Sequence, residues 1–128
     1  MCVVAVSEAG FNDLIEGNPV VVLDFAAAWC APCRAFEPVF AAAAAKHTDM
    51  VFARIDVDAL PDIADAFGVR SVPTLMIIRE KVLVVRHAGA LAAHALHGLL
   101  ERARILDMDD VRTEIAAMEG DQDAIDWC

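Results

Sequence analysis

Two cysteines with two residues between them are the side chains in this sequence best suited to chemistry. They are Cys30 and Cys33, within the stretch AAAWCAPCRAF at residues 26–36, and a proline stands directly before the second. Three kinds of chemistry are compatible with this spacing: a metal clamp, a structural disulfide and a redox-active dithiol. The surrounding sequence has to decide among them.

A structural zinc site normally takes four ligands, from two CxxC pairs or from cysteines and histidines at short spacing. The other cysteines, Cys2 and Cys128, lie at the two ends of the chain. His94 and His97 belong to an expected helix, with no carboxylate or cysteine close in the sequence, and are interpreted as part of its solvated face. We therefore expect neither a structural metal nor a cofactor.

The position of the cysteine pair favours the redox interpretation. The pair follows an apolar strand and opens a helix, where unpaired backbone N–H groups and the positive end of the helix dipole stabilise a thiolate. Cys30 comes before the helix, so we expect it to be the exposed nucleophile. Cys33, one turn later, would attack the mixed disulfide at Cys30 and release the product. An inert, buried pair of cysteines is the remaining alternative.

Composition limits the partners and the compartment. The chain has 128 residues and a formal net charge of −10, which suits a single domain and argues against nucleic acids and anionic membrane surfaces. Its apolar runs are shorter than the roughly 20 residues of a membrane-spanning helix. The first residues, MCVVAVSEAG, lack the basic start of a secretory signal. We expect a cytoplasmic protein, in a compartment too reducing for cysteines to serve as structural staples.

Hydrophobic periodicity predicts the elements that must position the cysteines. Apolar runs predict strands at 2–6, 20–25, 50–57, 74–78 and 82–85. Helices are expected from Ser7 as N-cap to Gly17, from Cys33 to about His47, from Pro61 to Gly68, and after Gly89. Strands separated by helices pair in parallel, and the last two strands form an antiparallel hairpin joined through residues 79–81.

The end of the chain differs from the rest in composition. Residues 107–128 hold eight acidic residues and one base, Arg112. The segment DMDDVRTEIAAMEG has Val111, Ile115 and Met118 at helical spacing, which predicts an extra amphipathic helix that stops at Gly120. The segment then either packs on its own domain or serves as a docking or dimer-forming element, and disorder is the remaining alternative.

Three segments of the chain resemble the thioredoxin family in order and spacing: VVVLDFAAAWCAPCRAFEP, ARIDVDALPDIADAFGVRSVPTL and HAGAL. The resemblance covers roughly residues 3–105. It implies an α/β fold with a central five-stranded mixed sheet flanked by helices, here with a short C-terminal helix. The thioredoxin-like domain would comprise 1–106 and the acidic extension 107–128. The implied activity is reduction of protein disulfides, with electrons supplied by thioredoxin reductase, an NADPH-linked flavoprotein.

The resemblance also implies roles for individual residues. Cys30 would attack, Cys33 would resolve, and Asp24 would be a buried carboxylate that helps to deprotonate the resolving thiol. Asp24 is also the polar residue of an otherwise apolar strand, and burial of a carboxylate is costly, so an aspartate at an exposed edge is the alternative. Pro73 would be a cis-proline facing the sulfurs, with Val72 offering backbone groups to an extended substrate. A flat apolar docking surface would be completed by Trp29, Ala31, Pro32, Gly89 and Ala90.

Several positions depart from the family pattern. Ala26 stands where an aromatic residue normally follows Asp-Phe, Arg54 replaces a lysine near the buried aspartate, and Glu80-Lys81 replaces an Asn-Gly-like hairpin turn. A rival function is a thioredoxin-like chaperone or assembly factor that holds client proteins through its apolar surface and acidic tail. The two cysteines, together with Asp24 and Pro73, favour the enzyme.

Overall fold

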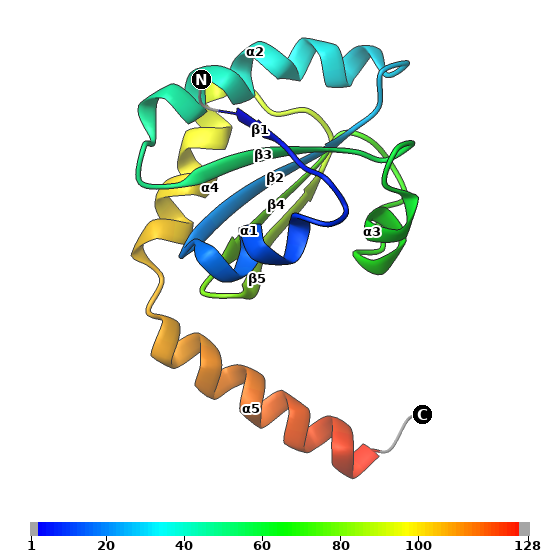
Figure 1. Ribbon diagram of the computed structural model, residues 1–128. Helices are drawn as coiled ribbons and strands as arrows, with labels where there is room; N and C mark the ends of the chain where they lie inside the picture. Colours follow the sequence, from blue (N-terminus) through cyan, green and yellow to red (C-terminus); the bar gives the residue numbers. More distant parts are fainter. Residues whose placement is uncertain (1–2, 126–128) are drawn as a thin grey trace.

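The computed structural model describes residues 3–125, with side chains described as far as Met118. Strands and helices alternate through the first seven elements, and then a second strand of a hairpin and two helices follow, as the sequence predicts (Figure 1). In order they are β1 (Val3–Ala5), α1 (Phe11–Gly17), β2 (Val20–Ala26), α2 (Ala31–Lys46), β3 (Val51–Asp56), α3 (Pro61–Ala66), β4 (Thr74–Arg79), β5 (Val82–Ala88), α4 (Ala93–Ile105) and α5 (Met108–Ile125).

One mixed sheet of five strands forms the centre of the fold, in the order β1-β3-β2-β4-β5. β3 pairs in parallel with β1 and with β2, whereas β4 pairs antiparallel with β2 and with β5. Parallel neighbours need a crossover, and here α1 connects β1 to β2 while α2 connects β2 to β3. The predicted fold class, a five-stranded mixed sheet flanked by helices, is confirmed.

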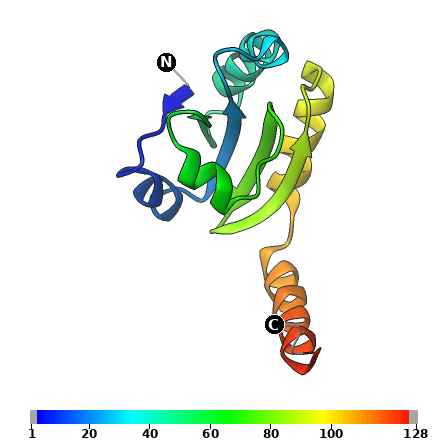
Figure 2. The same cartoon turned by 90° about the vertical axis from the view of Figure 1, so that its right-hand side faces the viewer.

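Helices cover both faces of the sheet, and each face has its own apolar core (Figure 2). α2 and α4 pack on the face that carries Val22, whereas α1 and α3 pack on the face that carries Leu23 and Phe25. Side chains alternate along a strand, so Asp24 of β2 points to the same face as Val22. The chain therefore places a carboxylate under α2, the helix that begins beside the two cysteines.

Strand register brings three loops together at one edge of the sheet. Phe25, near the end of β2, pairs with Thr74, and Thr74 also pairs with Ala88 at the end of β5. The loop after β2, the loop before β4 and the loop after β5 therefore lie side by side. These loops carry Cys30, Pro73 and Gly89 respectively.

Two helix boundaries differ from the prediction. α1 begins at Phe11 with Gly10 as its N-cap, and the Ser7 hydroxyl instead accepts a hydrogen bond from the Gly10 N–H at 3.0 Å, which stabilises the turn before the helix. α5 continues through Gly120 to Ile125 and has 18 residues, more than the 16 of α2, so the predicted short helix and its stop are wrong. A glycine costs a helix about 1 kcal/mol, which a long helix tolerates.

The end of α4 is closed by a side chain from the sheet. Arg79 Nη1 donates hydrogen bonds to the carbonyl oxygens of Ala103, Arg104 and Leu106, at 2.8, 3.0 and 2.6 Å. The last carbonyl groups of a helix have no partner within it, so this guanidinium satisfies groups that would otherwise depend on water. α4 is thereby completed before α5 begins.

α5 is attached to the domain near its start. Met108 is buried, and Arg112 forms an ion pair with Glu80 of the β4–β5 turn at 2.9 Å. Further along, Met118 is largely exposed, and the helix extends away from the sheet in both views (Figures 1 and 2). α5 therefore projects from the domain rather than packing along it.

Candidate functional site

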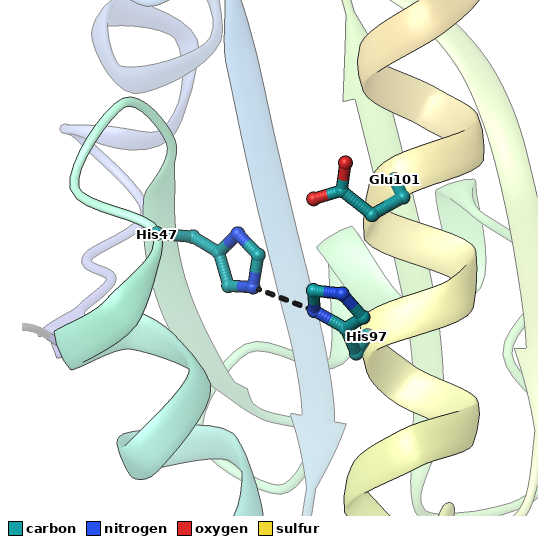
Figure 3. A group of neighbouring side chains, drawn as sticks. All are labelled: His47, His97 and Glu101. Atoms are coloured by element: carbon teal, nitrogen blue, oxygen red, sulfur yellow. Dashed lines mark hydrogen bonds between the residues drawn. The ribbon is translucent and has the colours of Figure 1, made fainter.

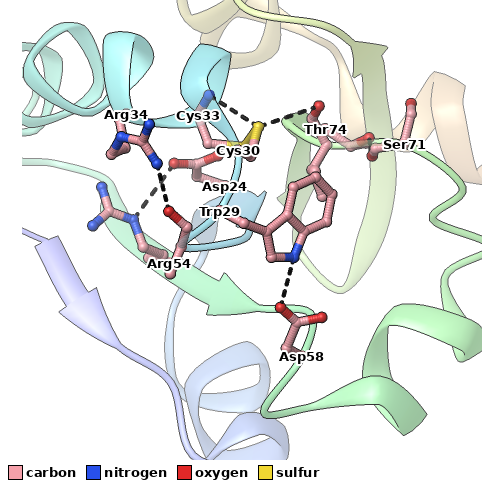
Figure 4. The surroundings of a disulfide bond; sticks show 11 residues. Asp24, Trp29, Cys30, Cys33, Arg34, Arg54, Asp58, Ser71 and Thr74 are labelled. Atoms are coloured by element: carbon pink, nitrogen blue, oxygen red, sulfur yellow. Dashed lines mark hydrogen bonds and ion pairs between the residues drawn. A yellow bond between two sulfur atoms is a disulfide. The ribbon is translucent and has the colours of Figure 1, made fainter.

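Cys30 and Cys33 form a disulfide at the start of α2 (Figure 4). Cys30 is the N-cap residue, with extended backbone, and its Sγ accepts a hydrogen bond from the Cys33 N–H at 3.1 Å. Pro32 lies in the first turn, where its missing N–H leaves no bond unmade. The first turn of α2 thus aims a backbone donor at Cys30 Sγ, which is the contact that would stabilise a thiolate there.

Both cysteines are nearly covered in this oxidised state. Cys30 is 4% exposed and Cys33 is 2% exposed. The expectation of an exposed Cys30 is wrong for the disulfide form, because Cys30 is bonded to Cys33 and packs in a small apolar cluster with Ala26, Ala27 and Val72. The exposed fractions therefore do not distinguish the roles of the two cysteines in this state. The groups that contact each sulfur have to distinguish them.

A loop with a cis peptide bond lies against Cys30. The Val72–Pro73 bond is cis, as the resemblance implies, and the Val72 carbonyl oxygen is 3.7 Å from Cys30 Sγ. The loop is fixed on both sides: the Thr74 hydroxyl donates to the Ser71 carbonyl at 2.6 Å, and the Gly89 N–H donates to the Pro73 carbonyl at 2.8 Å. Backbone groups beside the disulfide are thereby held in a fixed orientation.

The predicted docking residues surround this loop. Trp29 is 70% exposed, and its indole N–H donates to the Asp58 carboxylate at 2.9 Å, which holds the ring beside the disulfide (Figure 4). Pro73, the cis-proline expected to face the sulfurs, is buried. The others are exposed or partly exposed: Ala31, Pro32, Val72, Gly89 and Ala90.

Asp24 is fully buried, so the alternative of an exposed edge residue is wrong. Neither carboxylate oxygen has a hydrogen-bond partner among the described residues, and Oδ2 lies 3.7 Å from Arg54 Nε. Burial raises the pKa of Asp24 to about 6, and the positive charge of Arg54 opposes that rise. Arg54 is held in turn by Glu37, whose carboxylate is 3.1 Å from Nη1 and whose charge raises the pKa of Asp24 slightly further.

A cavity of about 310 Å³ opens next to Cys33. Its walls are the small side chains of residues 26–28 and its rim carries charged groups, so it links Cys33 with the Arg54–Glu37 pair. The departure at Ala26, where the family has an aromatic residue, contributes to this space.

Comparison with known proteins agrees with this geometry. The family model described as thioredoxin matches residues 2–102. A putative thioredoxin 2 from Streptomyces coelicolor is 43% identical over 116 residues, which is 91% of this chain and 87% of that protein. The chain belongs to the thioredoxin family.

Solved thioredoxins have the same fold. A thioredoxin variant from Halobacterium salinarum matches with a TM-score of 0.75 at 37% identity, over 82% of this chain and 93% of that one. A Plasmodium falciparum thioredoxin matches with a TM-score of 0.73 at 32% identity, over 77% and 97%. With the Cys30–Cys33 disulfide, these relatives identify the chain as a thiol–disulfide oxidoreductase of the protein-disulfide reductase type, acting on disulfide-containing proteins. Within residues 3–125, no helix has the length and apolar character needed to cross a membrane.

Sequence reasoning missed two residues of this thioredoxin site. Asp58 follows β3 and Trp29 follows β2, and because these strands are parallel neighbours, their carboxyl ends meet at one edge. Glu37 is four residues after Cys33 in α2 and therefore lies on the same helical face. The spacing of Glu37 from Cys33 can be read from the sequence, whereas the position of Asp58 can be inferred once the strand order is known.

The histidines of α4 also differ in part from the prediction. His94 and His97 are exposed, as expected, but His97 Nδ1 lies 3.4 Å from Nε2 of His47, the residue that caps the end of α2. Glu101, one turn after His97, belongs to the same group. The interpretation of a purely solvated face is wrong for His97, because it overlooked both the carboxylate four residues later and a contact between distant segments.

Proposed function

We propose that this thioredoxin-family protein reduces disulfides in two steps, with Cys30 attacking and Cys33 resolving. The Cys30 thiolate bonds to one substrate sulfur and the other leaves as a thiolate. The Cys33 thiolate then attacks Cys30 Sγ, which re-forms the Cys30–Cys33 disulfide and releases the reduced substrate, two electrons having passed to it. The supporting observation is the position of Cys30 Sγ, which accepts a hydrogen bond from the Cys33 N–H and faces the Val72 carbonyl.

Asp24 is the proposed proton acceptor for Cys33. It lies on the face of β2 covered by α2, and its pKa of about 6 leaves it mostly ionised at neutral pH. A carboxylate with that pKa can take a proton near physiological pH and release it again, which a solvated aspartate does poorly.

The substrate is proposed to dock as an extended strand across the loops around the disulfide. The fixed Val72 backbone offers hydrogen-bonding groups to such a strand. The apolar surface beside it is provided by Trp29, Ala31, Pro32, Gly89 and Ala90, while the buried cis-proline Pro73 is proposed to fix the backbone of the Val72 loop.

The electron donor is proposed to be thioredoxin reductase, an NADPH-linked flavoprotein, and the compartment the cytoplasm. The choice of donor rests on the family of the relatives and on the need of a reducing partner to return two electrons per turnover. The choice of compartment rests on the need for surroundings that are reducing enough to keep the dithiol reduced. The net charge of −10 supports protein partners rather than nucleic acids.

The proposed domain boundary lies between 1–106 and 107–128. Its support is Arg79, which closes the end of α4 at Leu106, and the acidic composition of residues 107–128.

Insulin reduction tests these roles. With dithiothreitol, and then with a thioredoxin reductase and NADPH, the native chain should accelerate precipitation of the insulin B chain, and Cys30→Ser should abolish the effect. Cys33→Ser should instead accumulate covalent mixed disulfides that are visible on non-reducing gels. A Cys33→Ser protein that turns over normally would assign resolution to another thiol. Suppression of client aggregation that is independent of both cysteines, without insulin reduction, would support the rival chaperone function.

A further inference from the structure

Three side chains from two helices meet at the end of α2 opposite to the disulfide (Figure 3). They are His47, which caps α2, and His97 and Glu101 of α4, and one ligand atom from each lies within 4.8 Å of the others. His97 and Glu101 are four residues apart and therefore share one face of α4. Two imidazoles and a carboxylate are groups that bind zinc and other divalent transition metals.

The distance between the two histidines suits a shared metal ion. His47 Nε2 and His97 Nδ1 are 3.4 Å apart, which is long for a hydrogen bond between ring nitrogens. Two nitrogens bound to one tetrahedral zinc ion, at the usual zinc–nitrogen length, are separated by about 3.3–3.4 Å. Glu101 is partly exposed and pairs with Arg104, so its carboxylate can close the remaining distance once that ion pair opens.

A guanidinium group lies among the same side chains. Arg104 Nη2 is 2.9 Å from His47 Nδ1, Nη1 forms an ion pair with Glu101, and Nε and Nη2 both contact the Asp49 carboxylate at 2.9 Å. The cluster is therefore already arranged around a positive charge. A guanidinium only donates hydrogen bonds, so His47 Nδ1 accepts this one and the ring is neutral, the form that metal binding needs.

We propose that His47, His97 and Glu101 form a binding site for a divalent transition metal, zinc being the best match, and that Arg104 competes for it as a cationic substitute. While Arg104 donates to His47 Nδ1, the neutral ring carries its proton on Nε2. Metal binding at Nε2 requires Arg104 to release Nδ1, and Asp49 holds the withdrawn guanidinium through its two contacts.

The site has an open side. A cavity of about 310 Å³ is bordered by His47 and His97, together with residues of α2 and the start of α4. A water molecule can therefore complete a four-coordinate ion, as in zinc sites with three protein ligands. The bound ion would join the end of α2 to α4, away from the dithiol.

Zinc titration by calorimetry tests the proposal. The protein should carry Cys2→Ser and Cys128→Ser and be oxidised, so that no free thiol competes for the metal. One zinc ion per chain is expected, and Co²⁺ should give the strong visible absorption of a four-coordinate site. His97→Gln and Glu101→Gln, which alter side chains that are not buried, should each weaken binding at least tenfold. His87→Gln, on β5, is the matched control and should bind as the parent does.

Arg104→Gln separates this site from an incidental histidine pair. Removing the competing guanidinium should tighten zinc binding about tenfold, and the tighter complex should again depend on His97. Absence of binding up to millimolar zinc overturns the proposal, as does binding that His97→Gln leaves unchanged. Unchanged or weaker binding by Arg104→Gln overturns the competition between the guanidinium and the metal.

Discussion

Asp24 is the residue in this molecule whose environment most constrains its chemistry. It is fully buried, its carboxylate oxygens make no hydrogen bond among the described residues, and its nearest cation is shared with Glu37. An ionised carboxylate in such surroundings destabilises the fold, so we expect Asp24 to have a functional role. Two substitutions measure that cost and its use.

The first substitution is Asp24→Asn. The pKa of Asp24 rises from 3.8 to about 6 on folding, so the folded state binds the proton more tightly than the unfolded state does. Stability should therefore fall as the pH rises from about 4 to about 6, and Asp24→Asn should remove this loss. At pH 7 the variant should be more stable by up to about 3 kcal/mol, and at pH 3.5 by little, as measured by urea unfolding.

The exposed Asp65 provides the control, since Asp65→Asn should change stability little at either pH. Resolution of the mixed disulfide by Asp24→Asn should nevertheless slow near neutral pH, because the proton acceptor is gone. A variant that is neither more stable at pH 7 nor slower would give Asp24 a merely structural role.

The second substitution is Glu37→Gln. Glu37 holds Arg54 Nη1 at 3.1 Å and adds negative charge near Asp24, and both effects raise the pKa of Asp24. Without Glu37, Arg54 is free to turn towards Asp24, so the acid limb of the pH–rate profile for insulin reduction should move to lower pH. Glu37→Asp keeps the charge and should restore much of the original profile. If the acid limb of Glu37→Gln lies at the same pH as that of the native protein, the proposed effect of Glu37 on the pKa of Asp24 is contradicted.

At the scale of the elements, the β4–β5 turn shows a sequence that fits its conformation poorly. Glu80 and Lys81 connect the strands with φ values of 51° and 70°, a region that glycine and asparagine adopt more easily than other residues. The register of the sheet is kept because the apolar strands on either side pair correctly. Local preference is overridden here by tertiary packing.

Lys81→Gly should therefore stabilise the fold, by about 0.5–1 kcal/mol, because glycine adopts the left-handed conformation without a steric penalty. Thermal unfolding measures the change. Lys81 also pairs with Glu16 at 3.0 Å, so Glu16→Gln is the matched control that removes the ion pair and keeps the turn. Because both variants lack the ion pair, a lower melting temperature in Lys81→Gly than in Glu16→Gln would contradict the expected gain from glycine in this turn.

The strands and most helices could be predicted from the sequence because their apolar patterns are long and regular. β2 is an unbroken apolar run apart from Asp24, and the Phe36 and Phe40 stripe marks α2. Contacts between segments far apart in the chain, such as Glu37 with Arg54 and His47 with His97, could not be predicted, since they depend on the packing of helices on the sheet. The predicted helix start at Ser7 and the predicted helix end at Gly120 were wrong, because a single capping residue is a weak signal compared with the residues around it.

At the scale of the whole molecule, α5 forms most of the acidic extension and projects away from the sheet. The contacts of α5 with the domain that can be described, through Met108 and Arg112, lie before residue 120. Deletion of 121–128 should therefore leave insulin reduction within about twofold of the native rate and the melting temperature nearly unchanged. A large loss of activity with a native circular dichroism spectrum would make the extension part of the active site.

Arg79 has a consequence for how this chain can be joined to others. Because its guanidinium satisfies the carbonyl groups of Ala103, Arg104 and Leu106, the hydrogen bonding of the domain is complete at that point. The buried Met108 and the Arg112–Glu80 ion pair attach the start of α5 to this finished end, so a foreign segment is best joined after Arg112. A fusion there keeps every described contact of α5 with the domain, and a reductase could be linked to a chosen protein while the face around Cys30 stays open.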